Sequence, residues 1–118
     1  MTKSRWKSRI KKACIEVGTY QKSFDAVIDT LAGILERRDK ALEEFDGRLI
    51  VEHTNKNGST NAEQNPLIRM INDLNRDALA YWRDLGLTPA GLKRINDAAV
   101  KGSKKQSALE KALAKLSE

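Results

Sequence analysis

The strongest constraint on the fold is a pair of helix-start signals on either side of a helix-stop signal. Asn65 followed by Pro66 favours a start, since asparagine accepts from free backbone N–H groups and proline at the first helical position loses no hydrogen bond. Gly86 predicts the end, because glycine adopts the left-handed cap without strain. Thr88 and Pro89 repeat the start signal, so two helices joined by a tight corner are expected.

The first of these two helices has one continuous apolar face. Its apolar residues recur every three to four positions over five turns, which is the period of an amphipathic α-helix. They are Leu67, Met70, Ile71, Leu74, Ala78, Tyr81, Trp82 and Leu85. Tyr81 and Trp82 share this face with Leu85, so we interpret them as core residues. Stacking on a nucleic acid base is the less favoured interpretation.

The segments before this pattern also favour helices. Residues 4–17 have one apolar stripe, and Gly18 predicts its end. Thr19 is a candidate cap for a second helix that runs to about Phe45 and would be roughly 40 Å long. Residues 47–64 break the helical period, and Asn57-Gly58 is a two-residue hairpin signal with arms at 49–56 and 59–63.

The Thr88-Pro89 helix is expected to reach about Val100. Gly102 and Ser103 are interpreted as an interruption before a final amphipathic segment at 103–118. A segment this short either docks or remains disordered. It is a candidate for a partner-binding helix, for a second weak polyanion contact or for a frayed tail.

Together these signals predict a mainly α fold with a bundle of about four to five helices and a short β-hairpin or long loop between the second and third. The length of 118 residues suits one domain. Its expected parts are a basic N-terminal helix (1–18), a helical core (19–100, with the hairpin or loop at 47–64) and a C-terminal amphipathic segment (101–118).

The net charge of +6 is concentrated at the N-terminus, because the first twelve residues hold six bases and no acid. Such a field attracts polyanions, and we expect these side chains to contact nucleic acid phosphates. The predicted DNA-binding residues are Lys3, Arg5, Lys7, Arg9, Lys11 and Lys12, with possible secondary contacts from Lys56, Lys93 and Arg94. A solvated basic tail and a membrane-surface helix are the weaker interpretations.

The long second helix and the modest number of large apolar residues favour association between copies of the chain. Its apolar stripe supplies the predicted oligomer interface. The residues are Phe24, Ile28, Leu31, Leu35 and Leu42.

The residue types needed for catalysis are scarce, and we predict no enzyme activity, metal or cofactor. His53 is the only histidine, and Cys14, the only cysteine, excludes an intramolecular disulfide and a cysteine-rich zinc site. There is no glycine-rich phosphate loop before a lysine and a serine or threonine. With no signal peptide and no apolar run of about 18 residues, an intracellular protein that does not enter the membrane is expected.

Several short patterns stand in a particular order and spacing over roughly residues 19–97. They are Tyr20, the Asp29, Leu31 and Ala32 region, Asp39, Glu44-Phe45, Gly47, Glu52, Asn55-Lys56-Asn57-Gly58, Asn65-Pro66 and Leu85-Gly86-Leu87-Thr88-Pro89. Their order and spacing resemble the small subunits of tailed-phage terminases. One departure follows the second helix start, where Ala90-Gly91-Leu92 stands in place of a small polar residue and an arginine.

This resemblance implies a non-catalytic component of the viral genome-packaging motor in the host cytoplasm. It would recognise double-stranded phage DNA, assemble as a ring-like homo-oligomer and deliver the DNA to a large terminase subunit that carries the ATPase and nuclease. Two alternatives stay open: a small helical DNA-binding regulator with the Gly86 corner as a helix-turn-helix, and a protein-interaction module that binds no nucleic acid.

Overall fold

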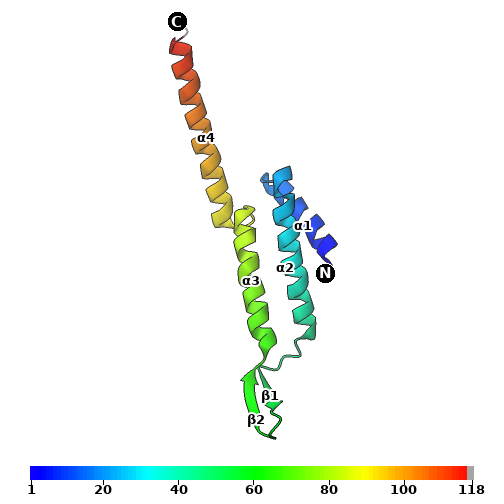
Figure 1. The fold of residues 1–118 in the computed structure, drawn as a ribbon. Helices are drawn as coiled ribbons and strands as arrows, with labels where there is room; N and C mark the ends of the chain where they lie inside the picture. The colour runs from blue at the N-terminus through cyan, green and yellow to red at the C-terminus, as the bar shows by residue number, and fades with distance from the viewer. Residues whose placement is uncertain (117–118) are drawn as a thin grey trace.

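The computed structural model describes residues 1–116, apart from the side chain of Ser103, and it is mainly helical (Figure 1). A two-stranded hairpin separates the second and third long helices, so the predicted fold class is confirmed. The last two residues of the predicted C-terminal segment lie outside the described residues. The elements are α1 (Lys3–Val17), the 3-10 helix η1 (Lys22–Phe24), α2 (Asp25–Glu44), β1 (Ile50–Thr54), β2 (Thr60–Gln64), α3 (Pro66–Asp84) and α4 (Pro89–Leu116).

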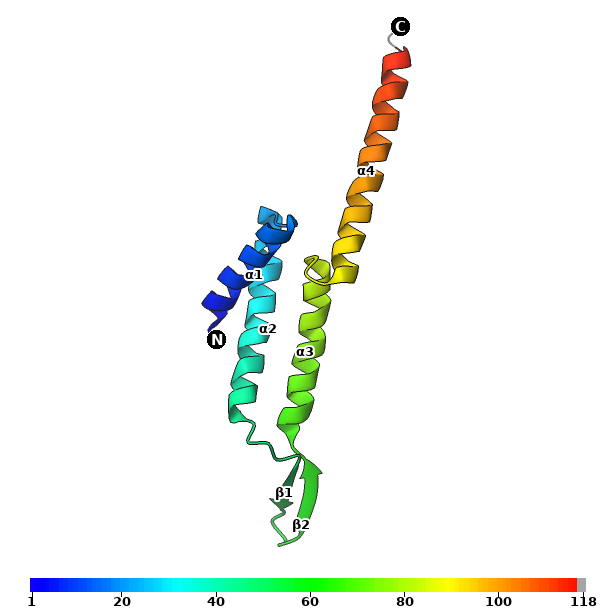
Figure 2. The same cartoon turned by 180° about the vertical axis from the view of Figure 1, so that it is seen from behind.

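Helix α2 is the centre of the body of the molecule. It runs antiparallel to α3 on one side and carries α1 on the other (Figures 1 and 2). The buried core lies where the three helices meet, and Trp6, Tyr81 and Trp82 pack against it while partly exposed. Its fully enclosed members are Ile10 and Cys14 of α1, Ile28, Leu31, Ala32, Ile34 and Leu35 of α2, Ala78 of α3 and Leu85 after it.

The predicted corner after α3 is present, and a buried hydroxyl holds it. Gly86 has φ +74°, and a Cβ at this position would lie 2.8 Å from Ile95 Cδ1 and 2.9 Å from Thr19 Cγ2. The Thr19 hydroxyl donates to the Leu85 carbonyl at 2.8 Å. Thr88 caps α4 as predicted, because its Oγ1 accepts from the Gly91 N–H at 3.0 Å.

Thr19 is therefore not the cap of the second helix, which corrects the sequence prediction. The η1 turn comes between them, and α2 begins only at Asp25. With 20 residues α2 is roughly 30 Å long, which is shorter than expected.

The hairpin is confirmed, but its loop differs from the predicted one. The Asn55 N–H donates to the Ser59 carbonyl at 2.7 Å, which leaves three loop residues instead of two. Within this loop only Gly58 has a positive φ, at +84°, whereas a two-residue type I′ turn requires two such residues. At the base of the hairpin, Asn65 is buried and caps α3 as predicted, accepting from the Leu67 N–H at 3.1 Å.

Helix α4 is one continuous helix, so the predicted interruption at Gly102 and Ser103 is wrong. An isolated glycine in an exposed helix costs only about 1 kcal/mol, and the flanking alanine, lysine and leucine residues favour the helix. The first turn of α4 packs against the end of α3, and the rest projects away from the body (Figure 2). The molecule is consequently elongated, with dimensions of 90 × 26 × 22 Å.

Two glycines of α4 give a matched test of this packing. We expect Gly91→Ala to destabilise the protein by about 1–3 kcal/mol, because its Cβ would press on the Arg83 carbonyl. We expect Gly102→Ala to stabilise the helix of the single chain, at low protein concentration, by roughly 0.5–1 kcal/mol, since nothing in that chain lies within 4 Å of its Cβ. Urea unfolding followed by circular dichroism measures both; a neutral Gly91→Ala would contradict the observed contact between α3 and α4.

Candidate nucleic-acid interface

Helix α1 is attached to α2 by an apolar stripe with a hydrogen-bonded aromatic residue at one end. Ile10 and Cys14 are 1% and 0% exposed. The Trp6 indole N–H donates to Asp39 Oδ2 at 2.8 Å. The helix is capped at its start by Thr2, whose side chain accepts from the Arg5 N–H, and at its end by Gly18 in the left-handed conformation. These contacts fix which face of α1 is turned away from the body.

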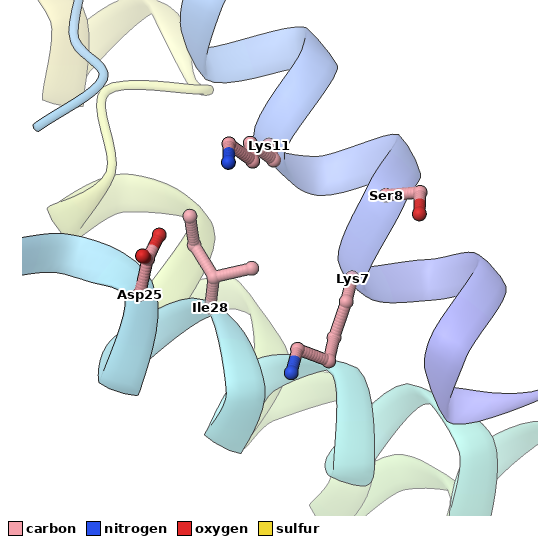
Figure 3. Close-up of a pocket in the computed structure, with 5 residues that line it drawn as sticks. All are labelled: Lys7, Ser8, Lys11, Asp25 and Ile28. Atoms are coloured by element: carbon pink, nitrogen blue, oxygen red, sulfur yellow. The ribbon is translucent and has the colours of Figure 1, made fainter. Parts of the chain in front are cut away.

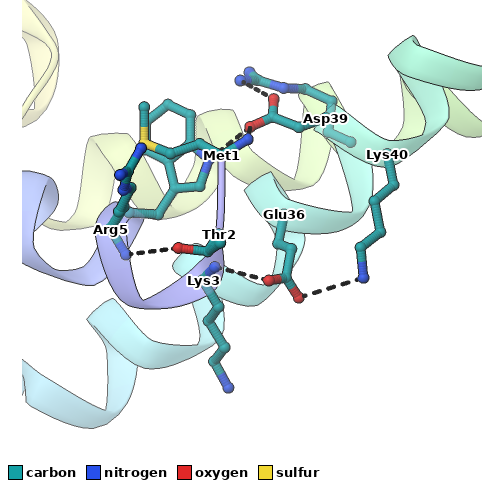
Figure 4. Close-up of polar contacts among 9 residues, drawn as sticks. Met1, Thr2, Lys3, Arg5, Glu36, Asp39 and Lys40 are labelled. Atoms are coloured by element: carbon teal, nitrogen blue, oxygen red, sulfur yellow. Dashed lines mark hydrogen bonds and ion pairs between the residues drawn. The ribbon is translucent and has the colours of Figure 1, made fainter.

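Asp39 collects donors from both helices (Figure 4). Besides Trp6, it accepts from the Met1 ammonium at 3.1 Å and from Arg38 at 3.2 Å. Burial acts to raise the pKa of Asp39, but the hydrogen bonds from Trp6, the N-terminal ammonium and Arg38 outweigh it and hold the pKa below its ordinary value. The charged carboxylate therefore stabilises the docked position of α1.

Part of the predicted DNA-binding set lies beside α2 and has partners there, although Lys7 and Lys11 remain exposed. The ammonium groups of Lys3 and Lys7 each lie 3.2 Å from a carboxylate oxygen of Asp29, and their hydrogen bonds lower the pKa of that carboxyl. The Lys11 ammonium lies 5.0 Å from the centre of the Tyr20 ring. Figure 3 shows Lys7 and Lys11 reaching toward α2 beside Asp25 and Ile28, while Ser8 points away. These three bases have partners within the chain.

The other three predicted bases form what we call the outer face of α1: Arg5, Arg9 and Lys12. They line one shallow hollow together with Ser4 and Ser8. All three are exposed, and no acid of α1 lies among them before Glu16. The Arg9 guanidinium also lies 5.6 Å from the centre of the Trp6 ring, which restrains it without neutralising it. This face offers guanidinium and ammonium donors and small hydroxyls, the groups that contact phosphate.

The predicted secondary contacts lie on two other elements. Lys56 is exposed in the hairpin loop, and Lys93 and Arg94 are exposed on the first turns of α4. Lys93 and Arg94 line a shallow hollow together with Asp97 and Lys101. The structure does not bring any of these positions onto the outer face of α1.

Helix α4 is a second basic element, which the concentration of the net charge at the N-terminus conceals. Residues 13–88 hold nine bases and 13 acids, whereas α4 holds seven bases and two acids. In the net charge of the chain, the excess of acids in residues 13–88 therefore cancels most of the excess of bases in α4. Summing the charge separately for each predicted helix would have revealed this second basic region from the sequence.

The residues of the predicted oligomer interface are mostly used inside the chain. Ile28, Leu31 and Leu35 are 2%, 0% and 0% exposed, and Phe24 packs against the same core. Leu42 is 48% exposed, so it keeps a surface available to another molecule.

His53, the one histidine, is exposed on β1 and pairs in register with Asn61 of β2. Within residues 1–116, no three histidine, cysteine, aspartate or glutamate side chains are grouped so that they could hold a metal ion. The described helices include none that is long and apolar enough to cross a membrane.

The profile of a known protein family, described as phage terminase, small subunit, matches residues 2–101. The chain belongs to the phage terminase small subunit family. The match includes the whole of α1, the hairpin and the corner between α3 and α4. No match was found among curated proteins or among solved structures.

The corner of this terminase small subunit does not have the shape of a helix-turn-helix. In that motif two helices meet at about 90–120° and the second enters the major groove. Here α4 starts beside the last turn of α3 and continues in nearly the same direction (Figures 1 and 2). This arrangement argues against the regulator alternative.

The attachment of α1 is expected to depend on pH through Asp39. Since its folded pKa is lowered, its contribution is present above the ordinary aspartate value of about 3.9 and is lost as the pH falls through the folded value. We expect Asp39→Asn to cost about 1–3 kcal/mol at pH 7 and less at pH 3. Urea unfolding at the two pH values measures this difference.

Asp29→Asn is the control, because Asp29 forms only exposed ion pairs and its loss should change stability little. An equal cost for Asp39→Asn at both pH values would show that the carboxylate charge does not hold α1.

Proposed function

We propose that this chain is the DNA-recognition subunit of a phage genome-packaging terminase, acting in the host cytoplasm. It is a non-catalytic, homo-oligomeric adaptor that binds double-stranded phage DNA and delivers it to the large terminase subunit, where the ATPase and nuclease reside. The family membership supports the terminase role in general, and the outer face of α1 is the observation that supports the DNA contact.

The outer face of α1 is both basic and available to a phosphate. Lys3 and Lys7 already have a carboxylate partner, so a phosphate would have to compete with Asp29 for them. Arg5, Arg9 and Lys12 are exposed on a rigidly attached helix, and none of them forms an ion pair with a carboxylate within residues 1–116. Binding phosphate there releases counterions from the DNA without breaking an internal pair.

Three bases on one copy give modest affinity, and phosphate contacts carry no direct sequence information. Several copies acting on one DNA molecule raise the apparent affinity through effective concentration. The homo-oligomer is thus the form in which we expect tight binding, with weak sequence selectivity and strong salt dependence.

Two double variants with the same change in charge test the DNA contact. We expect Arg5→Gln/Arg9→Gln to weaken binding of a double-stranded DNA fragment about tenfold or more at low salt. We also expect the slope of log affinity against log salt to fall by roughly 1.8 per copy, or 0.9 for each lost phosphate contact. Fluorescence anisotropy with a labelled duplex measures both quantities.

The matched control is Lys3→Gln/Lys7→Gln, which should change affinity less than about threefold because those bases pair with Asp29. Circular dichroism melting of both variants checks that α1 stays docked. Equal losses in the two variants would mean that only total charge matters, and unchanged affinity in the first would remove the outer face from the interface.

A further inference from the structure

Helix α4 carries an apolar stripe whose spacing differs from that of a helix packed on a globular body. The spacings alternate between three and four residues along the whole helix, which is the heptad pattern of a coiled coil. The positions are Leu92, Ile95, Ala99, Gly102, Gln106, Leu109, Leu113 and Leu116, which we call the α4 seam.

Only the base of the α4 seam is used within the chain. Leu92 and Ile95 are partly buried at the corner, where Ile95 lies next to Gly86. Beyond them, every described side chain from Asn96 to Leu116 is exposed. Leu109, Leu113 and Leu116 are 62%, 56% and 83% exposed on a helix that projects away from the body (Figure 1). Such a row of exposed leucines indicates a surface for contact with another molecule.

We propose that the α4 seam pairs with the α4 seam of a second copy as a parallel coiled coil. The charges beside the seam carry this choice of partner. In heptad terms Leu109 is a d position, which makes Lys105 a g position and Glu110 the next e position. In a parallel pair, g of one helix lies next to e of the following heptad on its partner, so Lys105 meets Glu110 of the other copy.

The remaining bases fit the same arrangement. They fall at the outer b, c and f positions, away from the seam, where two copies do not bring them together. These are Lys93, Arg94, Lys101, Lys104, Lys111 and Lys115. An antiparallel pair would instead align g with g and e with e, which loses the attraction between Lys105 and Glu110.

The small and polar members of the seam are consistent with self-pairing. Ala99 and Gly102 let two helices approach closely, and Gln106 at an a position favours a single register, as one buried polar residue does in coiled coils. Most of the seam lies beyond Lys101, where the match to the terminase family ends. The pairing rests on the proposed function, which requires several copies of the chain. It adds the surface through which two copies join.

A charge exchange tests the parallel register. We expect Glu110→Lys to weaken self-association roughly two- to tenfold at low salt, because two lysines then face each other. The double variant Lys105→Glu/Glu110→Lys should restore it. Lys104→Glu, at an outer position, serves as the control with little expected effect. Sedimentation velocity over a range of concentrations measures each case, and a double variant no better than Glu110→Lys alone would overturn the parallel pairing.

Disulfide trapping tests the seam directly. Leu109→Cys should give a covalent dimer under mild oxidation, whereas Ser107→Cys, on the outer side, should remain monomeric on a non-reducing gel. Cys14 is 0% exposed and should not react. Neither substitution removes a buried side chain, because both positions are exposed. Equal trapping at 107 and 109, or none at 109, would overturn the proposal.

DNA binding by the same variants separates the two proposals. Trapping at position 109 in a protein that does not bind DNA would reject the DNA-recognition role and keep the α4 pairing. DNA binding with no trapping would keep that role and reject the pairing.

Discussion

The fold depends on the hydrogen bond between the Thr19 hydroxyl and the Leu85 carbonyl. It joins the end of α1 to the end of α3, across 66 positions of sequence, in a place where both groups are buried. An unpaired hydroxyl or carbonyl there would cost about 1–3 kcal/mol, so the contact specifies one arrangement. Gly86 lies directly beside it, and its positive φ directs α4 away from the body.

The molecule consists of a packed body and a projecting helix, and the two have different proposed roles. The α1–α2–α3 body has most of the acids and the whole buried core. Helix α1 is fixed by Trp6, Ile10 and Cys14, so its outer bases are held in constant positions. Helix α4 leaves the body after its first turns and exposes an apolar seam on one side and bases on the other. The DNA contact and the contact between copies are therefore proposed on separate elements.

Much of this could be predicted from the sequence, because the local signals are strong. The caps at Asn65 and Thr88 and the stop at Gly86 depend on neighbouring backbone, and the structure confirms them. The role of Thr19 could not be predicted, since its partner comes from a distant segment. Likewise, six bases on one short helix do not reveal which three face Asp29 and Tyr20. At Gly102 the flanking helix-forming residues offset the roughly 1 kcal/mol cost of one glycine, so the glycine alone is not evidence of a break.

The most direct test of the account is the salt dependence of binding to double-stranded DNA, for the parent chain and for Leu109→Asp/Leu113→Asp. Each phosphate contact contributes roughly 0.9 to the slope of log affinity against log salt. We expect a parent slope steeper than about −2.7, the value for the three bases on the outer face of one copy, and a shallower slope once the α4 seam is disrupted. A slope near zero, or one that the seam variant leaves unchanged, would contradict it.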